Sequence, residues 1–248
     1  MVHPAPSILV LIAAYNEESG IGPTLNELND TIPDSQFMVV DGNSIDKTVE
    51  VAKNNGAEVI FQEGTGKGNA ISQAIQTIDF NPKYVIFTDA DYTYPVSRVN
   101  EMIDILDSNP EIGMVVGSRF SRMFIPKSMT HPLYLGNRFL ALAQFFLNGI
   151  KLSDPLSGLR VVRWSIIKNW RPRSRGFDIE VEMNHHIERS GYRIVEVPIN
   201  YRNRLGEKKL KIKHGFKIFM RIVSESLTHH TNYASGCTSD TGTFDETD

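Results

Sequence analysis

Short apolar runs alternate with amphipathic segments along the first half of the chain. Five runs have the length and composition of buried strands, namely residues 7–13, 37–40, 57–61, 84–88 and 113–117. Four segments between them have helical spacing, namely residues 20–28, 46–54, 68–78 and 96–106. Strands that alternate with helices predict an α/β fold with a mostly parallel sheet flanked by helices on both faces.

This alternation lapses after Arg119. The pattern then predicts helices over 139–147, 177–190 and 212–227, a strand over 158–162, an extended stretch over 192–201 and a charged loop over 203–210. The last 21 residues, 228–248, are rich in Thr, Ser, Gly and Asp and lack Lys and Arg. We expect this tail to be disordered, because it has too few apolar side chains to bury.

Composition limits the classes of protein that the chain can represent. Its 248 residues are 41% hydrophobic and carry a net charge of −3, which is typical of a globular protein and argues against nucleic-acid binding by bulk charge. The single cysteine, Cys237, excludes an intramolecular disulfide. No apolar stretch approaches the ~20 residues of a membrane span, and no signal peptide is visible. We therefore expect a cytoplasmic protein.

The sharpest chemical motif is Asp89-Ala90-Asp91, directly after the strand 84–88. Ligands of parallel sheets bind beyond the carboxyl ends of the strands. Two carboxylates at that position can converge on Mg²⁺ or Mn²⁺ and a diphosphate. A surface triplet without a metal is the alternative, and the placement after a central strand favours the metal site.

Two further polar groups follow predicted strands. Tyr15 could pack on a base, and Glu17 could accept hydrogen bonds from ribose hydroxyls; capping of the next helix by Asn16 or Glu17 is the alternative. Asp41 could contact a base or ribose, or form an Asx turn within Asp41-Gly42-Asn43-Ser44. The sequence leaves these alternatives open.

The segment Gly64-Thr65-Gly66-Lys67-Gly68-Asn69 matches neither phosphate-binding pattern in full. Asn69 replaces the third glycine of the dinucleotide pattern, and Gly68 replaces the Ser or Thr that follows Gly-Lys in the phosphate loop. A glycine-rich turn before a helix can still hold an anion. An ordinary strand-to-helix turn is the alternative.

Together these motifs resemble family 2 glycosyltransferases of the GT-A fold. The order and spacing of 12–18, 39–48, 66–71, 88–91 and 116–119 carry the resemblance. Three later segments resemble the dolichyl-phosphate mannose and glucose synthase branch, namely 152–160, 176–180 and 204–210. The resemblance implies one domain over 1–227, with a nucleotide-sugar half over 1–118 and an acceptor and membrane-facing half over 119–227.

The resemblance also implies a role for each matching residue. It implies a catalytic set of Asp91, Arg119, Arg204 and Lys209, with Arg119 at the acceptor phosphate and the other two cations on a loop over the phosphates. It implies a metal pair of Asp89 and Asp91. It implies a nucleotide-binding set of Ala14, Tyr15, Asn16, Glu17, Asp41, Lys67, Gly68, Asp89 and Ala90. Thr93 stands where some members carry a metal-contacting glutamine.

The implied reaction is inverting transfer of a hexose from a nucleotide sugar to dolichyl or another polyprenyl phosphate. An acceptor phosphate is already ionised near neutral pH, so no side-chain base is required. The motifs look closer to users of UDP-glucose or UDP-N-acetylglucosamine than of GDP-mannose. The alternatives are transfer to a hydroxyl, for which Asp154, Asp178 or Glu180 could be the base, and a silent binding protein.

Residues 201–221 predict contact with a membrane surface. They contain eight Lys and Arg residues against the single acid Glu207. Ile212, Phe216, Phe219, Val223 and Leu227 share one face of the predicted helix. A basic amphipathic helix can lie on an anionic membrane or pack on the sheet. We expect peripheral membrane association, and a homo-oligomer or a membrane-protein partner stays open.

Overall fold

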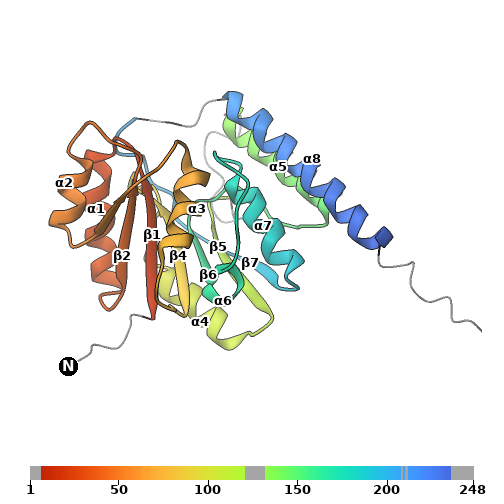
Figure 1. The fold of residues 1–248 in the computed structure, drawn as a ribbon, viewed down its shortest axis with the longest axis horizontal. Coiled ribbons are helices and arrows are strands. Elements are labelled where there is room, and N and C mark those ends of the chain that lie inside the picture. The colour runs from red at the N-terminus through yellow and green to blue at the C-terminus, as the bar shows by residue number, and fades with distance from the viewer. Residues whose placement is uncertain (1–6, 121–131, 208, 210–211, 236–248) are drawn as a thin grey trace, which may run out of the picture.

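A computed structural model describes residues 7–120, 132–207, 209 and 212–235. Its centre is a seven-stranded sheet of order β3-β2-β1-β4-β6-β5-β7 (Figure 1). The strands are β1 (Ile8–Ala14), β2 (Gln36–Asp41), β3 (Glu58–Phe61), β4 (Tyr84–Asp89), β5 (Ile112–Ser118), β6 (Arg160–Arg163) and β7 (Arg193–Pro198). Only β6 runs antiparallel to its neighbours, β4 and β5. The predicted mostly parallel α/β sheet is confirmed.

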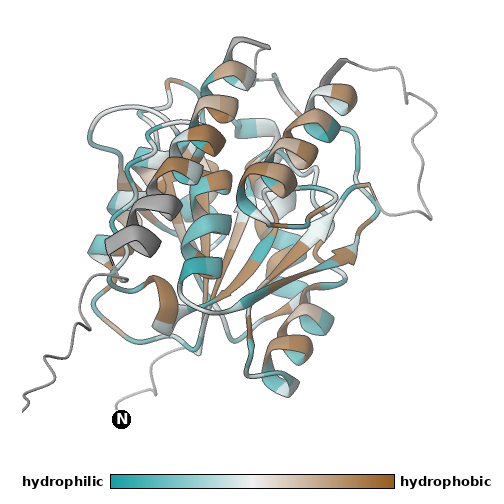
Figure 2. Ribbon diagram, turned by 90° about the vertical axis from the view of Figure 1, so that its right-hand side faces the viewer, coloured by the Kyte–Doolittle hydropathy of each residue, from teal (hydrophilic) through white to brown (hydrophobic). Residues whose placement is uncertain are grey.

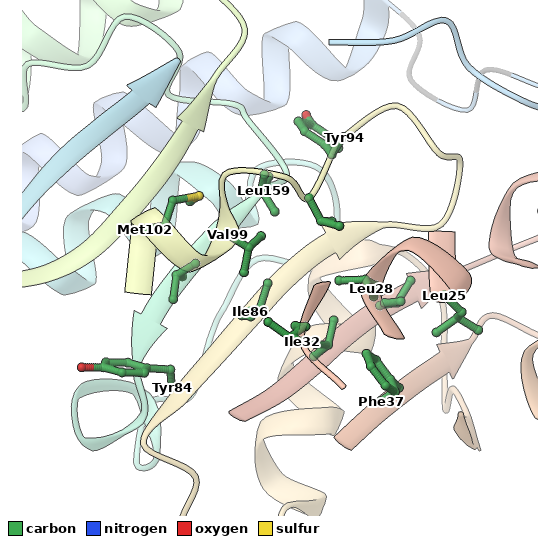
Figure 3. Close-up of a cluster of buried hydrophobic side chains, with 14 of the residues drawn as sticks. Leu25, Leu28, Ile32, Phe37, Tyr84, Ile86, Tyr94, Val99, Met102 and Leu159 are labelled. Atoms are coloured by element: carbon green, nitrogen blue, oxygen red, sulfur yellow. The ribbon is translucent and has the colours of Figure 1, made fainter. Parts of the chain in front are cut away.

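The central strands are apolar on both faces because helices cover both. Alternate residues of β1 enter two separate cores, with Val10 and Ile12 in one and Leu9 and Leu11 in the other. The first core (Figure 3) lies under α1 (Glu18–Thr31), α2 (Thr48–Asn54) and α4 (Val99–Ser108). The second lies under α3 (Lys67–Thr77), α6 (Trp164–Ile167) and α7 (Ile179–Arg189). The four-residue helix α6 was not predicted.

The sheet passes through both predicted halves of the chain. β6 and β7 come from beyond residue 118, yet β6 lies between β4 and β5, and β7 pairs with β5. The halves 1–118 and 119–227 therefore share one sheet.

Helices α5 (Pro132–Asn148) and α8 (Ile212–Ser235) pack against each other at one end of the molecule (Figure 1). Ile218 and Ile222 of α8 are buried with Leu140 of α5 and Val181 of α7. The predicted amphipathic C-terminal helix is present, but Phe219 of the predicted face packs inward together with Ile218 and Ile222, which lie outside that face. Phe216 and Leu227 of that face are exposed (69% and 65%).

Helix α8 extends to Ser235, into the segment that the sequence predicts to be a disordered tail, and disorder of that tail stays a prediction. No glycine or proline interrupts the chain between Leu227 and Gly236, so nothing local ends the helix earlier. The remaining tail, 236–248, lies outside the described residues. Over the described part of the chain, no helix is long and apolar enough to cross a membrane.

Candidate active site

Strand register brings the predicted site residues to one edge of the sheet. Asp41 at the end of β2 pairs with Ala14, and Asp89 at the end of β4 pairs with Ala13. The loops that follow β1, β2 and β4 therefore leave the sheet side by side. The side chains of Ala14 and Ala90 are buried in the apolar core, so only their backbone could face a nucleotide.

Asp89 is held by a buried lysine. Lys67 Nζ lies 2.6 Å from Asp89 Oδ1 and 2.6 Å from Glu180 Oε1, so it bridges the donor loops and α7. Burial by itself raises the pKa of Asp89, but Lys67, Arg119 and Arg204 together outweigh burial and lower it. Burial lowers the pKa of Lys67, and the two carboxylates reverse this and raise it. The Asp89 carboxylate is therefore ionised at neutral pH.

Gly158 allows the loop before β6 to approach Asp89 closely. A Cβ atom at Gly158 would lie 2.8 Å from Asp89 Oδ2, and the Gly158 N–H donates to Tyr94 Oη at 2.8 Å. Any larger residue would displace the carboxylate.

Asp91 is held in a different way from Asp89. Its Oδ1 accepts hydrogen bonds from Thr93 N at 3.1 Å and Thr93 Oγ1 at 2.5 Å, and its Oδ2 lies 2.8 Å from Arg204 Nη1. Burial raises the pKa of Asp91, and the neighbouring charge of Asp89 adds to this. The two hydrogen bonds from Thr93 orient Asp91. Thr93 stands where some family members carry a metal-contacting glutamine.

Glu17 lies beneath the loop that follows β7. It forms ion pairs with Arg204 and, at 3.8 Å, with Lys209 Nζ. Lys209 Nζ also donates to the Asn16 carbonyl at 3.0 Å. Burial raises the pKa of Glu17 to about 7, against the opposing charges of Arg204 and Lys209. The structure thus places the predicted loop cations, Arg204 and Lys209, against Glu17, which was predicted to bind the nucleotide.

Asp41 forms the Asx turn that the sequence indicated as one of its two possible roles. Its Oδ1 and Oδ2 accept hydrogen bonds from Ser44 N at 2.8 Å and Ser44 Oγ at 2.6 Å. Ser44 Oγ in turn accepts from Asn16 N at 2.8 Å, which ties the loops after β1 and β2 together. The ring of Tyr15 beside them is half exposed. Contact of either residue with a base or ribose stays a prediction.

The glycine-rich segment packs closely against backbone. A Cβ atom at Gly68 would lie 2.3 Å from the Ser174 carbonyl oxygen, and Asn69 N donates to the Arg175 carbonyl at 3.3 Å. The glycine is required because the first turn of α3 touches the segment before α7. This supports the strand-to-helix turn, and contact of Gly68 with a nucleotide stays a prediction.

Arg119 is fixed by a buried aspartate, Asp154. Its Nε and Nη2 each lie 2.7 Å from a different oxygen of Asp154, in a two-point ion pair. Its guanidinium lies 5.4 Å from the ring centre of Tyr201 and 5.2 Å from that of Phe120. The charges of Arg119 and Arg204 add to that of Lys67 in lowering the pKa of Asp89 against its burial.

Sequence reasoning missed several residues that hold these groups in place. Asp154 and Glu180 were considered only as bases, whereas each binds a site cation. Glu196 was not singled out, and it accepts hydrogen bonds from Ser153 N and Asp154 N, both at 2.8 Å. Asp154 lies within the motif 152–160, so the sequence did point to this residue as part of the site. No local pattern pointed to Glu196, because its partners lie over 40 positions away.

All three carboxylates considered as a base hold cations. Asp154 binds Arg119, Glu180 binds Lys67, and Asp178 Oδ2 lies 3.1 Å from Arg221 Nε. Among the described residues, no group of three His, Cys, Asp or Glu side chains forms a metal site. The site is therefore an aspartate pair surrounded by cations, which suits a phosphate-rich substrate.

The sheet and the aspartate pair after β4 define an α/β enzyme of GT-A type. The chain belongs to glycosyl transferase family 2, whose model matches residues 9–170. It is 30% identical to glycosyltransferase AglJ of Haloferax volcanii over 94% of this chain and 77% of that protein. It is 33% identical to a dolichyl-phosphate hexose transferase of the same organism over 82% and 86%. The predicted resemblance to the dolichyl-phosphate branch is confirmed.

A solved structure supports the fold. It is glucosyl-3-phosphoglycerate synthase from Mycobacterium tuberculosis in complex with Mn²⁺, UDP-glucose and phosphoglyceric acid. The two chains are 20% identical, with a TM-score of 0.68 over 90% of this chain and 80% of that one. The predicted GT-A fold is thus confirmed, and the match to glycosyl transferase family 2 confirms the predicted enzyme class.

Proposed function

We propose that this glycosyltransferase moves a hexose from a nucleotide sugar to a polyprenyl phosphate such as dolichyl phosphate. The observation that carries the proposal is that Lys67 and Arg204 form ion pairs with Asp89 and Asp91, while the nearby charge of Arg119 also lowers the pKa of Asp89. A reaction between two phosphate-bearing substrates requires such compensation of charge. The dolichyl-phosphate hexose transferase among the relatives supports the acceptor class.

The acceptor phosphate is the nucleophile in this proposal. Its second pKa is about 6, so one of its oxygens is anionic at neutral pH without a base. That oxygen attacks the anomeric carbon, the bond from this carbon to the diphosphate oxygen breaks, and the nucleoside diphosphate leaves. Arg119, held rigidly by Asp154, binds the acceptor phosphate, and Arg204 and Lys209 bind the diphosphate. Direct displacement inverts the anomeric configuration.

Asp89 and Asp91 fit a divalent cation, Mg²⁺ or Mn²⁺, because both are hard oxygen donors at the carboxyl end of β4. When bound, the ion would neutralise the diphosphate charge. The Mn²⁺ in the synthase structure supports this assignment. We assign Tyr15, Asn16, Glu17, Asp41 and the backbone of Ala14 and Ala90 to the nucleotide, with Lys67 and Gly68 beside it. UDP-glucose and UDP-N-acetylglucosamine are the favoured donors, and GDP-mannose is the third candidate.

The helix pair α5–α8 supports peripheral membrane association. Its outward apolar side chains include Phe139, Phe146 and Phe216, which are 59%, 77% and 69% exposed, and Figure 2 views the molecule from this side. Helix α5 has no acidic residue, and the single acid of α8, Glu225, is buried and paired with Arg189 and Arg221. An apolar face without exposed acid suits an anionic bilayer, where the acceptor resides.

A transfer assay tests the function. Purified protein with Mg²⁺ or Mn²⁺ and short-chain dolichyl phosphate receives labelled UDP-glucose, UDP-N-acetylglucosamine or GDP-mannose. We expect organic-extractable label from one donor, lost with chelator and in Asp91→Asn, and a product of inverted anomeric configuration by NMR. Label on a hydroxyl acceptor, or no lipid-linked label despite donor binding, would overturn the proposal.

A further inference from the structure

The segment after β7 lies across the aspartate pair. Arg202 N donates to the Thr93 carbonyl at 3.0 Å, and Leu205 N donates to the Asp91 carbonyl at 3.1 Å. A Cβ atom at Gly206 would lie 3.2 Å from Glu17 Oε2, so the backbone passes directly over this carboxylate. The described residues of this segment, 199–207, form no helix or strand. Contacts with the donor-side loops therefore hold it.

Arg204 occupies the oxygen of Asp91 that carries no hydrogen bond from Thr93. Asp91 Oδ1 is already occupied by two hydrogen bonds from Thr93, and Asp91 Oδ2 holds Arg204 Nη1 at 2.8 Å. A divalent cation on Oδ2 would meet the guanidinium at a single oxygen atom. Two cations in contact repel strongly in a site shielded from solvent.

Of the two cations on the aspartate pair, Arg204 is the one that can leave. Lys67 extends from helix α3 and is clamped between Asp89 and Glu180, so its departure would leave two carboxylates unpaired. Arg204 belongs to a loop, and its other partner, Glu17, retains Lys209 at 3.8 Å. After release of Arg204, Glu17 therefore keeps Lys209 as a neighbouring cation.

We propose that Arg204 is an internal cation that competes with the divalent metal for Asp91, so that metal binding releases Arg204 toward the donor diphosphate. This inference rests on the proposed metal role of Asp89 and Asp91. When a divalent ion replaces Arg204 at Asp91, the local charge rises by one unit, whereas it would rise by two if Arg204 stayed. The released guanidinium is then free to bind the diphosphate. Metal binding and the Arg204–Asp91 pair are thus mutually exclusive.

Binding of Mn²⁺ without nucleotide gives the first test. The electron paramagnetic resonance signal of free Mn²⁺ measures the bound fraction for the full chain. We expect Arg204→Gln to bind Mn²⁺ about three- to tenfold more tightly than the unaltered protein, because the competing ion pair is gone. With UDP present we expect the gain to shrink, because Arg204 then contributes to nucleotide binding.

Two matched variants serve as controls. Arg202→Gln removes a charge from the same loop, but Arg202 pairs with Glu27 and not with Asp91. Arg98→Gln removes a charge that pairs with the exposed Glu101. Both should change Mn²⁺ affinity less than about twofold. Equal affinity of Arg204→Gln and the unaltered protein, or no Mn²⁺ binding by either, would overturn the inference.

A second test needs no variant. Phenylglyoxal modifies accessible guanidinium groups, and peptide mass spectrometry reads the extent at Arg204. Mn²⁺ should raise the modification rate of Arg204 several-fold and leave that of Arg98 unchanged. An unchanged or reduced rate at Arg204 would overturn the inference. Neither binding test reads sugar transfer, so a failure of the inference is distinguishable from a failure of the proposed function, which the transfer assay tests separately.

Discussion

The donor-side loops and the helix pair α5–α8 differ in what they leave exposed. At the ends of β1 and β4, every carboxylate of the site is matched by a cation, as in Asp89 with Lys67 and Asp91 with Arg204. On the helix pair, apolar side chains such as Phe146 stay uncovered (77% exposed). We propose that the first region binds charged groups and that the second meets the apolar phase of a membrane. Arg119 links the two regions, because its guanidinium lies against Phe120, whose ring contacts Tyr134 of α5, and we propose that it binds the acceptor phosphate.

The largest expected effect comes from removing the charge of Asp91. Asp91→Asn should lower the transfer rate by about 10²- to 10³-fold, because a preorganised electrostatic contact to the departing diphosphate is lost. Initial rates with the preferred donor measure it. Binding to vesicles should stay unchanged, which separates the two regions. Asp104→Asn on the exposed face of α4 is the matched control, and an equal loss there would contradict the assignment.

A substitution at Arg119 tests the connection between the two regions. Arg119→Lys keeps the charge but loses the two-point contact with Asp154. We expect kcat/KM for the acceptor to fall by about 10²-fold, while donor affinity measured by calorimetry stays within about twofold. Arg171→Lys, on the exposed surface, should change neither. A loss confined to donor affinity would contradict this assignment, because it would mean that Arg119 binds the donor and not the acceptor phosphate.

The buried charges of the donor side predict a pH dependence of stability. The pKa of Glu17 is about 7 in the folded protein, against an ordinary value of 4.5. Between these values the folded state keeps a proton that the unfolded chain loses. The free energy of unfolding should therefore fall by on the order of 1–3 kcal/mol as pH rises through this window, and level off above it.

Urea unfolding of the metal-free protein at several pH values checks this sign. Glu17→Gln carries no titrating proton, so its stability should lack this part of the pH slope. Glu63→Gln, an exposed glutamate on a donor-side loop, provides the comparison. Identical slopes for Glu17→Gln and the unaltered protein would show that Glu17 titrates normally.

The smallest effect concerns the apolar face. Phe146→Ser on α5 should weaken binding to anionic vesicles about fivefold, since one partly inserted aromatic side chain is lost. Flotation with phosphatidylglycerol vesicles measures this, and transfer to a water-soluble short-chain acceptor should stay within about twofold. Phe61→Ser removes a similarly exposed phenylalanine (54%) from β3, at the other end of the sheet. Equal weakening of vesicle binding by both substitutions would show that the helix pair is not the membrane-binding surface.

Much of the fold followed from local pattern, and less of the site did. The runs 7–13 and 84–88 were identified as strands because buried parallel strands are continuously apolar. The position of β6 between β4 and β5 was not foreseen, since strand order depends on packing between segments far apart in sequence. The end of α8 at Ser235 was not foreseen, because polar composition alone indicated a tail from residue 228.

The sequence by itself determined the alternation of strands and helices, the motif Asp89-Ala90-Asp91 and the family that these motifs resemble, because periodicity and motif spacing are local properties. Only the tertiary structure decided which charges meet. Arg119 meets Asp154 across 35 positions and Arg204 meets Glu17 across 187. Ion pairs act over a few ångströms in space and have no signature in sequence separation, so the sheet and the segment after β7 had to be in place before those partners could be named.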